Sequence, residues 1–339
     1  DDHLKFVFLT GVSKFAGLSV FSALNSLKDI TLDENYASIC GYTQMELEDN
    51  FPEHIDRAAQ YIGMIHDELL AEIRYWYDGY TWDGKTSVYN PYSTLMFFDN
   101  KRFTDYWFRT GTPTFLIEII QRRNRVETVL EPTTVSESVF DGYDPQNIGE
   151  LPLLFQTGYL TVKHVEVNHG KAKYTLDVPN MEVSDSLLTH LLAAYGKYPN
   201  EDIDNLREMM EQHLREGDEQ GFANCLEAMI ATVPYELQSG CEHYYHIIML
   251  IWMRLLGFKI QGEKPNNRGI ADAVWEQPGL TVVAELKYHA EKKIKTLLNE
   301  AMKQIHDRRY YNQYIGKVIL LGIAFSGKDV GCRMEELKR

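Results

Sequence analysis

The residues from 241 to 325 alternate between helical and extended hydrophobic patterns, and their order limits the possible folds more than any other feature of the chain. The predicted elements are a helix at 241–257, strands at 258–264, 269–276 and 280–289, a long amphipathic helix at 291–314 and a fully apolar strand at 317–325. This order, α-β-β-β-α-β, predicts a small domain built around a mixed sheet.

The rest of the chain predicts further α/β structure, and 339 residues are enough for two or three domains. Thr43 and Glu46 have capping-box spacing at a helix start. The expected elements are a buried parallel strand at 4–12, helices at 43–51 and 53–77 with a break near Gly63, paired strands at 151–167 and around 173–180, and a helical region from 184 to 237. We predict domains at 1–100, 101–234 and 235–339.

The overall charge is acidic, with 34 Lys and Arg against 49 Asp and Glu and a formal net charge of −15. Phosphate contacts supply much of the affinity for nucleic acids, so this chain should not bind them over its whole surface. One basic segment, 287–309, carries Lys287, Lys292, Lys293, Lys295, Lys303, Arg308 and Arg309. Any nucleic-acid contact is expected there, although a charged helix face is most often simply solvated.

The cysteines and the most apolar segment indicate where in the cell the protein is expected. Cys40, Cys225, Cys241 and Cys332 form no CxxC pair, which disfavours a zinc ribbon or a disulfide framework and favours a cytoplasmic location. The apolar run 247–258 contains Arg254 and is too short to span a bilayer, so we interpret it as a buried helix and expect no membrane contact.

The hairpin "ADAVWEQPGLTVVAELKYH" at 271–289 places charged residues in an otherwise apolar region. Glu285 and Lys287 lie two residues apart, so both face one side of their strand, and Asp272 on the preceding strand can approach that side. Two neighbouring carboxylates favour a bound cation, and Mg²⁺ or Mn²⁺ with oxygen ligands suits phosphodiester chemistry. Glu242 on the preceding helix is a candidate outer carboxylate, and Gln304 on the following helix can hydrogen-bond into the site.

The alternative interpretation of the hairpin is an exposed edge with its charges in water. Exposed strands often carry Glu and Lys two residues apart, so the D…ExK pattern alone is weak evidence for catalysis. Glu285, however, follows "TVVA" and precedes Leu286 in a strand that should be largely buried, where an unpaired charge is costly.

The chain resembles the bacterial AAA-ATPase-like proteins, abundant in Bacteroides-type organisms, that carry a C-terminal PD-(D/E)XK nuclease-like domain. The matching phrases are FVFLTGVSKF at 6–15, LNSLKDIT at 24–31, WYDGY at 76–80, YNPYS at 89–93, YWFRTGTPTFL at 106–116, LFQTGYLT at 154–161, VPNMEV at 178–183, EHYYH at 242–246, AELKY at 284–288, KQIH at 303–306 and GIAFS at 322–326.

The resemblance implies the C-terminal part of a P-loop ATPase-like domain with its helical lid at 1–100. A mixed helical and β middle region would follow at 101–234, and a restriction-endonuclease-like domain at 235–339. The G-x-x-x-x-G-K-[ST] pattern matches at 79–86, GYTWDGKT, but this segment is a turn-rich aromatic stretch rather than a loop between a strand and a helix, so we expect the ATP site to be absent and expect no ATP hydrolysis. Thr10 occupies the position of a sensor residue, and Lys14 follows it.

In the nuclease-like part, the family pattern falls on Asp272, Glu285, Lys287 and Gln304, with Glu242 on the first helix. Members of the family usually have an arginine two residues before the first aspartate, and Ile270 stands there in this chain. Arg268 lies two residues further upstream. This departure concerns the anchoring of substrate more than the binding of metal.

The sequence therefore predicts a metal-dependent nuclease acting on DNA or RNA, with Asp272 and Glu285 as ligands of Mg²⁺ or Mn²⁺ and Lys287 as the catalytic cation. The competing prediction is a non-catalytic regulatory or interaction protein that retains degenerate ATPase and nuclease folds. The expected partner is nucleic acid at 287–309, and a homo-oligomer or an ATPase partner is left open.

Overall fold

The computed structural model divides into two compact units, Asp1–Ser186 and Leu187–Arg339. The described residues are 5–11, 28–108, 114–123, 126–140, 149–196, 198–231, 242–260, 270–289, 291–326 and 329–337; some side chains within these ranges, including those of 242–246 and 270–272, lie outside the description. The unit boundary falls inside a helix, whereas the sequence-based division has its boundaries near 100 and 235 and stays a prediction.

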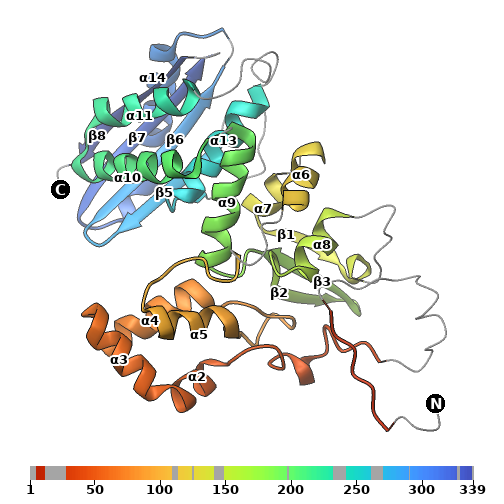
Figure 1. Cartoon of the computed structure of the whole chain (residues 1–339). Helices are drawn as coiled ribbons and strands as arrows, with labels where there is room; N and C mark the ends of the chain where they lie inside the picture. The colour runs from red at the N-terminus through yellow and green to blue at the C-terminus, as the bar shows by residue number, and fades with distance from the viewer. Residues whose placement is uncertain are drawn as a thin grey trace. The chain divides into compact units, whose positions relative to one another are not determined.

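Short helices form the first part of unit 1 (Figure 1). They are η1 (Glu34–Tyr36), α2 (Gln44–Asn50), α3 (Pro52–Ile62), α4 (His66–Tyr77) and α5 (Pro91–Asn100). The predicted capping box is confirmed: the Thr43 side chain accepts the Glu46 N–H, and the Glu46 side chain accepts the Thr43 N–H. The predicted break is confirmed at Gly63, whose positive φ of 81° ends α3.

Aromatic and aliphatic side chains fill the space between these helices. Phe97 on α5 stacks on Phe103 with ring centroids 4.5 Å apart, and Tyr77 at the end of α4 packs against both. Asn90 accepts the N–H groups of Tyr92 and Ser93, so the Asn-Pro step begins α5.

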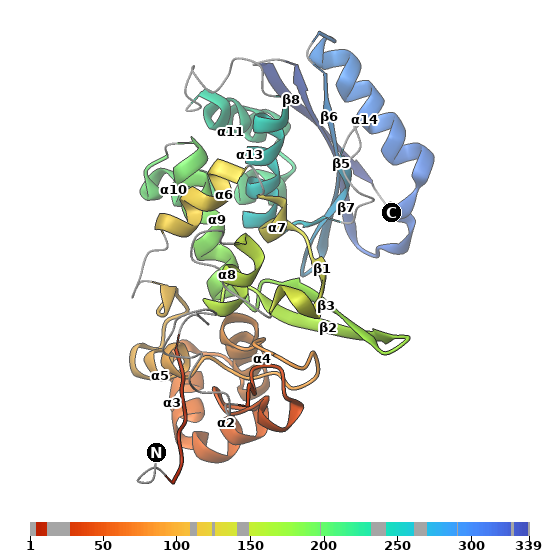
Figure 2. The ribbon, with the colours of Figure 1, turned by 90° about the vertical axis from the view of Figure 1, so that its right-hand side faces the viewer.

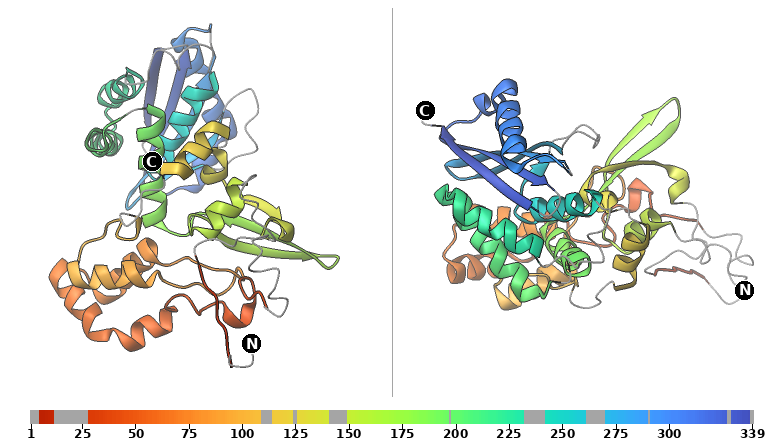
Figure 3. Two further views of the ribbon diagram at one scale, coloured as in Figure 1. Left: turned by 45° about the vertical axis from the view of Figure 1, so that its right-hand side comes forward. Right: turned by 90° about the horizontal axis from the view of Figure 1, so that it is seen from above.

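A three-stranded antiparallel sheet of order β1-β3-β2 completes unit 1. Its elements and their neighbours are α6 (Thr114–Arg123), α7 (Glu127–Leu130), β1 (Thr133–Ser136), η3 (Glu137–Val139), α8 (Glu150–Gln156), β2 (Thr161–Asn168) and β3 (Lys171–Asp177). The strands β2 and β3 form a hairpin (Figure 3, left), and its turn residues His169 and Gly170 both have positive φ.

In unit 1 one predicted strand is wrong and another is wrong in its first part, while the predicted pairing of 161–167 with the strand around 173–180 is confirmed. The described residues 5–11 form no strand, and Phe6 is 81% exposed, because no described strand pairs with this apolar segment. The segment from 151 to 156 lies in α8 rather than in a strand, since Leu153 and Leu154 are buried on one side of a helix. Hydrophobicity alone could not distinguish these outcomes.

The helices of the second unit come before its strands in the sequence or between them. They are the end of α9 (Met181–Gly196), α10 (Asn200–Glu216), α11 (Glu219–Ala231), α13 (Glu242–Leu255), α14 (Ile294–Arg308) and η4 (Tyr310–Gln313). The helices α10 and α11 lie side by side (Figure 3, right). None of the helices in the described part of the chain has the length and apolar character needed to cross a membrane.

A five-stranded mixed sheet of order β4-β5-β6-β7-β8 forms the core of unit 2. Its strands are β4 (Lys259–Ile260), β5 (Ile270–Gln277), β6 (Leu280–Tyr288), β7 (Lys317–Ser326) and β8 (Asp329–Leu337). The strands β6 and β7 are parallel, and the other neighbours are antiparallel. The predicted order α-β-β-β-α-β is confirmed, and β8 extends it.

Helices cover both faces of this sheet (Figure 2). The helix α14 packs on one face through Leu297, Met302 and Ile305, while α11 and α13 lie on the other. The strand β8 is the last in the sheet, and the N–H of its Met334 donates to the Glu219 carboxylate at 2.7 Å. The start of α11 is thereby tied to β8.

Candidate active site

The strand β6 carries the charged pair that the sequence singled out. Its first seven residues, Leu280 to Leu286, are all buried, and Glu285 is 0% exposed. Alternation places Glu285 and Lys287 on the face that α14 covers, together with Val283, which packs against α14. An isolated carboxylate at this depth would be strongly unfavourable, so its partners determine what the site can do.

Lys287 connects the carboxylate to α14. Its Nζ donates to Glu285 Oε1 at 2.8 Å and to Gln304 Oε1 at 2.5 Å, and its side chain is only 11% exposed. Gln304 lies on the sheet-facing side of α14, three residues after the buried Ala301. The structure thus brings together three of the five residues selected from the sequence.

A glycine beside Glu285 lets the helix lie close to the sheet. In the parallel register Glu285 is opposite Gly322 of β7. A Cβ atom on Gly322 would lie 3.1 Å from Met302 Sδ and 3.3 Å from Ala301 Cβ, which is tighter than ordinary contact. The absence of a side chain at 322 therefore helps to set the distance between α14 and the strand that carries Glu285.

The backbone of β5 brings Asp272 to a register shift across from Glu285, although the Asp272 side chain lies outside the description. Ala273 pairs with Ala284, and Asp272, the residue before Ala273, lies towards the position of Glu285 without a regular partner of its own. The register then shifts before the Ile270–Leu286 pair, so 271 and 272 share the space across from one β6 residue. Such a bulge redirects side chains and is common next to active sites.

Other predicted site residues are placed only in part. Glu242 is the first residue of α13, but its side chain lies outside the described ones. Arg268 lies outside the described residues, and Ile270 is described only as part of β5. Among the described side chains, no set of three His, Cys, Asp or Glu residues could hold a metal ion.

The comparison with known families decides what kind of domain contains this pair. Residues 240–335 match the PD-(D/E)XK nuclease superfamily. They form a PD-(D/E)XK nuclease superfamily domain. The whole chain is also 31% identical over 334 residues to an uncharacterized protein in the vnfD 5′ region of Azotobacter chroococcum mcd 1. That match covers 96% of this chain and 62% of the relative. No solved structure matches the chain.

The donor set of the nuclease-superfamily domain fits a hard divalent cation. Glu285 provides carboxylate oxygen, and Asp272 lies in the neighbouring strand at the register shift across from Glu285, with its side chain outside the described ones. Oxygen ligands of this kind suit Mg²⁺ or Mn²⁺, whereas no thiol belongs to this group.

Basic residues lie along the segment that follows β6 in this domain. Lys292, Lys293, Lys295 and Lys303 are all exposed, and Lys292 pairs with Glu300 at 2.9 Å. The segment 287–309 carries seven Lys and Arg residues against the acids Glu291, Glu300 and Asp307, so it is locally basic in an acidic chain.

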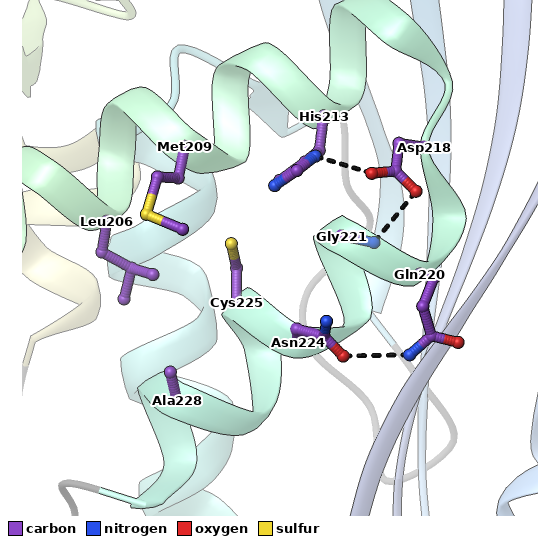
Figure 4. Close-up of a pocket in the computed structure, with 9 residues that line it drawn as sticks. All are labelled: Leu206, Met209, His213, Asp218, Gln220, Gly221, Asn224, Cys225 and Ala228. Carbon is purple, nitrogen blue, oxygen red and sulfur yellow. Dashed lines mark hydrogen bonds and ion pairs between the residues drawn. The ribbon is translucent and has the colours of Figure 1, made fainter.

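A pocket of about 490 Å³ lies between α10 and α11 (Figure 4), on the side of the sheet away from α14. His213 Nδ1 is 2.9 Å from Asp218 Oδ2, and the Cys225 sulfur points into the same space. Burial raises the pKa of the Cys225 thiol, so the cysteine is not an activated nucleophile. The pocket is separated from Glu285 by the sheet.

Unit 1 contains a buried carboxylate that the sequence did not reveal. Glu182, in the first turn of α9, is 0% exposed. Its Oε1 accepts hydrogen bonds from Ser93 Oγ at 2.9 Å and from the Trp107 N–H at 2.7 Å. Its Oε2 has no hydrogen-bond partner in the described part of the chain, and burial raises the pKa of the carboxyl to about 7. The family phrases around 93, 107 and 182 thus meet at one buried acid.

Proposed function

We propose that the domain at 240–335 hydrolyses phosphodiester bonds of DNA or RNA with the help of Mg²⁺ or Mn²⁺. The observation that carries the proposal is the buried Glu285–Lys287 pair, held against Gln304 in a domain of the PD-(D/E)XK nuclease superfamily. A buried ion pair is not needed to stabilise a sheet, since apolar residues of similar size do this as well or better.

Each residue of the proposed site has a separate task. Asp272 and Glu285 hold the metal ion, which when bound supplies a Lewis acid for the phosphoryl oxygens. Lys287 faces the scissile phosphate and neutralises the charge that develops on it. Gln304 positions Lys287 through the 2.5 Å contact with Nζ, and Glu242 serves as an outer carboxylate.

The binding of nucleic acid is proposed for the exposed lysines that follow β6. Their charge can displace counterions from the phosphate backbone while the rest of the acidic chain contributes little. DNA and RNA share this backbone chemistry, so both polymers are candidate substrates.

The decisive experiment combines calorimetry with a cleavage assay. Mg²⁺ and Mn²⁺ are titrated into the wild type, Glu285→Gln and the matched control Glu276→Gln, which changes a carboxylate that pairs with Lys259 on the same sheet. We expect saturable binding and cleavage of DNA or RNA for the wild type and the control, and the loss of both for Glu285→Gln. Cleavage that persists in Glu285→Gln at wild-type rates would refute the assignment.

The second candidate is a non-catalytic regulatory or interaction protein. The contacts of Lys287 favour it in one respect: Glu285 and Gln304 both accept from its Nζ, as in a purely structural ion pair. In that case no divalent ion binds, and Glu285→Gln changes stability without changing any interaction with nucleic acid.

The N-terminal resemblance leads to a separate proposal, that residues 1–100 derive from a P-loop ATPase-like domain. Its support is the set of family phrases before residue 100, because the G-x-x-x-x-G-K-[ST] match at 79–86 lies in a turn bridged by Tyr80 and Val88 and not between a strand and a helix. We expect no ATP hydrolysis from this chain. The cytoplasmic location likewise stays a prediction.

A further inference from the structure

His289 directly follows β6 and continues the face that carries the candidate active site. Its N–H donates to the Phe325 carbonyl at 3.1 Å, so the pairing of β6 with β7 extends to this residue. Strand alternation places His289 on the same side as Glu285 and Lys287. Exposure increases along the three residues, from the fully buried carboxylate through the mostly buried lysine to the exposed imidazole.

The hydrogen bonds of the imidazole define which nitrogen is available. Nδ1 accepts the backbone N–H of Glu291 at 3.1 Å and that of Lys292 at 3.3 Å. A ring nitrogen that accepts carries no proton, so in the neutral ring the proton is on Nε2. The turn after β6 therefore presents an N–H donor at the exposed end of the site.

The spacing suits a polymeric anion. His289 lies about 6.6 Å beyond Lys287 along the strand, at ~3.3 Å per residue. Among the neighbouring cations, Lys292 is paired with Glu300, while Lys293 and Lys295 are exposed beside it. A phosphate next to the scissile one would thus meet a directional N–H donor in a basic surrounding.

We propose that His289 is a substrate-contacting residue whose Nε2–H donates to a non-scissile phosphate of the bound nucleic acid. This inference rests on the proposed nuclease function and adds the position at which the polymer leaves the site. His289 holds the flanking phosphate in place, while the assigned chemistry stays with Asp272, Glu285 and Lys287.

Two substitutions distinguish the proposed role of His289 in binding phosphate from its role in shaping the turn after β6. In His289→Asn, the amide oxygen can replace Nδ1 as the acceptor for Glu291 and Lys292, but the distal donor is lost. In His289→Gln, the amide nitrogen can replace the Nε2–H donor, but the acceptor of the turn is lost. The affinity of the full chain for a short fluorescein-labelled DNA or RNA oligonucleotide is measured by anisotropy in Ca²⁺, with urea denaturation as a check on folding.

We expect His289→Asn to weaken binding about tenfold and His289→Gln to stay close to the wild type. The opposite order would show that the imidazole only shapes the turn, and equal affinities or equal losses in both variants would also overturn the proposal. A wild type that binds oligonucleotide but does not cleave it in Mg²⁺ would overturn the nuclease function alone. A wild type that binds neither polymer would overturn both.

Discussion

Lys287 Nζ lies 2.8 Å from Glu285 Oε1 on one face of a strand whose first seven residues are buried. The two charges compensate each other in a region where either alone would be costly. A divalent ion bound to Glu285 would add positive charge next to the ammonium group. The pair therefore links the stability of the domain to the occupancy of its proposed metal site.

The first prediction concerns this pair in metal-free buffer. Lys287→Met removes the ammonium group and leaves the buried Glu285 carboxylate without it, which should lower the free energy of unfolding by about 3 kcal/mol. Glu285→Gln combined with Lys287→Met should recover most of this loss, because no charge is then buried. Urea denaturation of the two single variants and the double variant measures the coupling. Additive effects would show that the pair is not coupled.

The second prediction concerns the space between β7 and α14. Gly322→Ala would place a methyl group 3.1 Å from Met302 Sδ, and we expect a loss of stability of about 1–3 kcal/mol together with weaker metal binding. Gly11→Ala is the control, since nothing lies within 4 Å of its added Cβ. An unchanged urea midpoint for Gly322→Ala would mean that α14 moves to accommodate the methyl group without a loss of stability.

The third prediction is a pH dependence of stability that arises from Glu182. Its pKa is about 7 in the folded protein against an ordinary value of 4.5, so the folded state holds this proton more tightly than the unfolded chain. The contribution to stability is therefore present below pH 4.5 and is lost as pH rises towards 7. The total loss corresponds to about 3 kcal/mol at ~1.4 kcal/mol per pKa unit.

Glu182→Gln should remove this pH dependence, because the amide oxygen can still accept from Ser93 and Trp107. Glu118 is exposed on α6, and Glu118→Gln is expected to keep the wild-type profile. The test is to measure the thermal stability of the wild type, Glu182→Gln and Glu118→Gln at several pH values between acidic and neutral. If Glu182→Gln follows the wild-type curve, the proton is not taken up at Glu182.

The fourth prediction concerns nucleic-acid binding by the basic segment. Lys295→Ala with Lys303→Ala should weaken oligonucleotide binding and lower the slope of log affinity against log salt by about 2. Lys171→Ala with Lys173→Ala, on the exposed β2–β3 hairpin, is the matched control and should leave the slope unchanged. Equal slopes in both double variants would place the contact elsewhere.

The sequence predicted the elements of unit 2 well because its apolar runs are long and their periods are distinct. It missed β8, since Asp329–Leu337 includes charged residues and has one partly exposed side. In unit 1 it predicted a buried strand over 4–12, of which the described residues 5–11 form none, because an apolar pattern does not reveal whether a strand partner is present. In both cases the environment of the segment, rather than its composition, decided the outcome.

The candidate site could be predicted as far as local alternation reaches. Glu285 and Lys287 share a strand face by their spacing, just as the spacing of Thr43 and Glu46 in unit 1 predicted their capping box. The sequence placed Gln304 on the following helix, able to hydrogen-bond into the site, but its contact with Lys287 depends on how closely α14 packs. Glu182 could not be found in this way, because Ser93 and Trp107 lie 89 and 75 residues away in the chain.

The bond between Glu219 and the Met334 N–H occupies a backbone donor on the outermost strand of the sheet. An outermost strand normally offers unpaired backbone groups to other chains and can start edge-to-edge aggregation. Here a strand from another molecule would have to displace a carboxylate from the middle of β8 before it could pair there. The contact from α11 thus covers one backbone donor that an outermost strand would otherwise offer to edge-to-edge pairing.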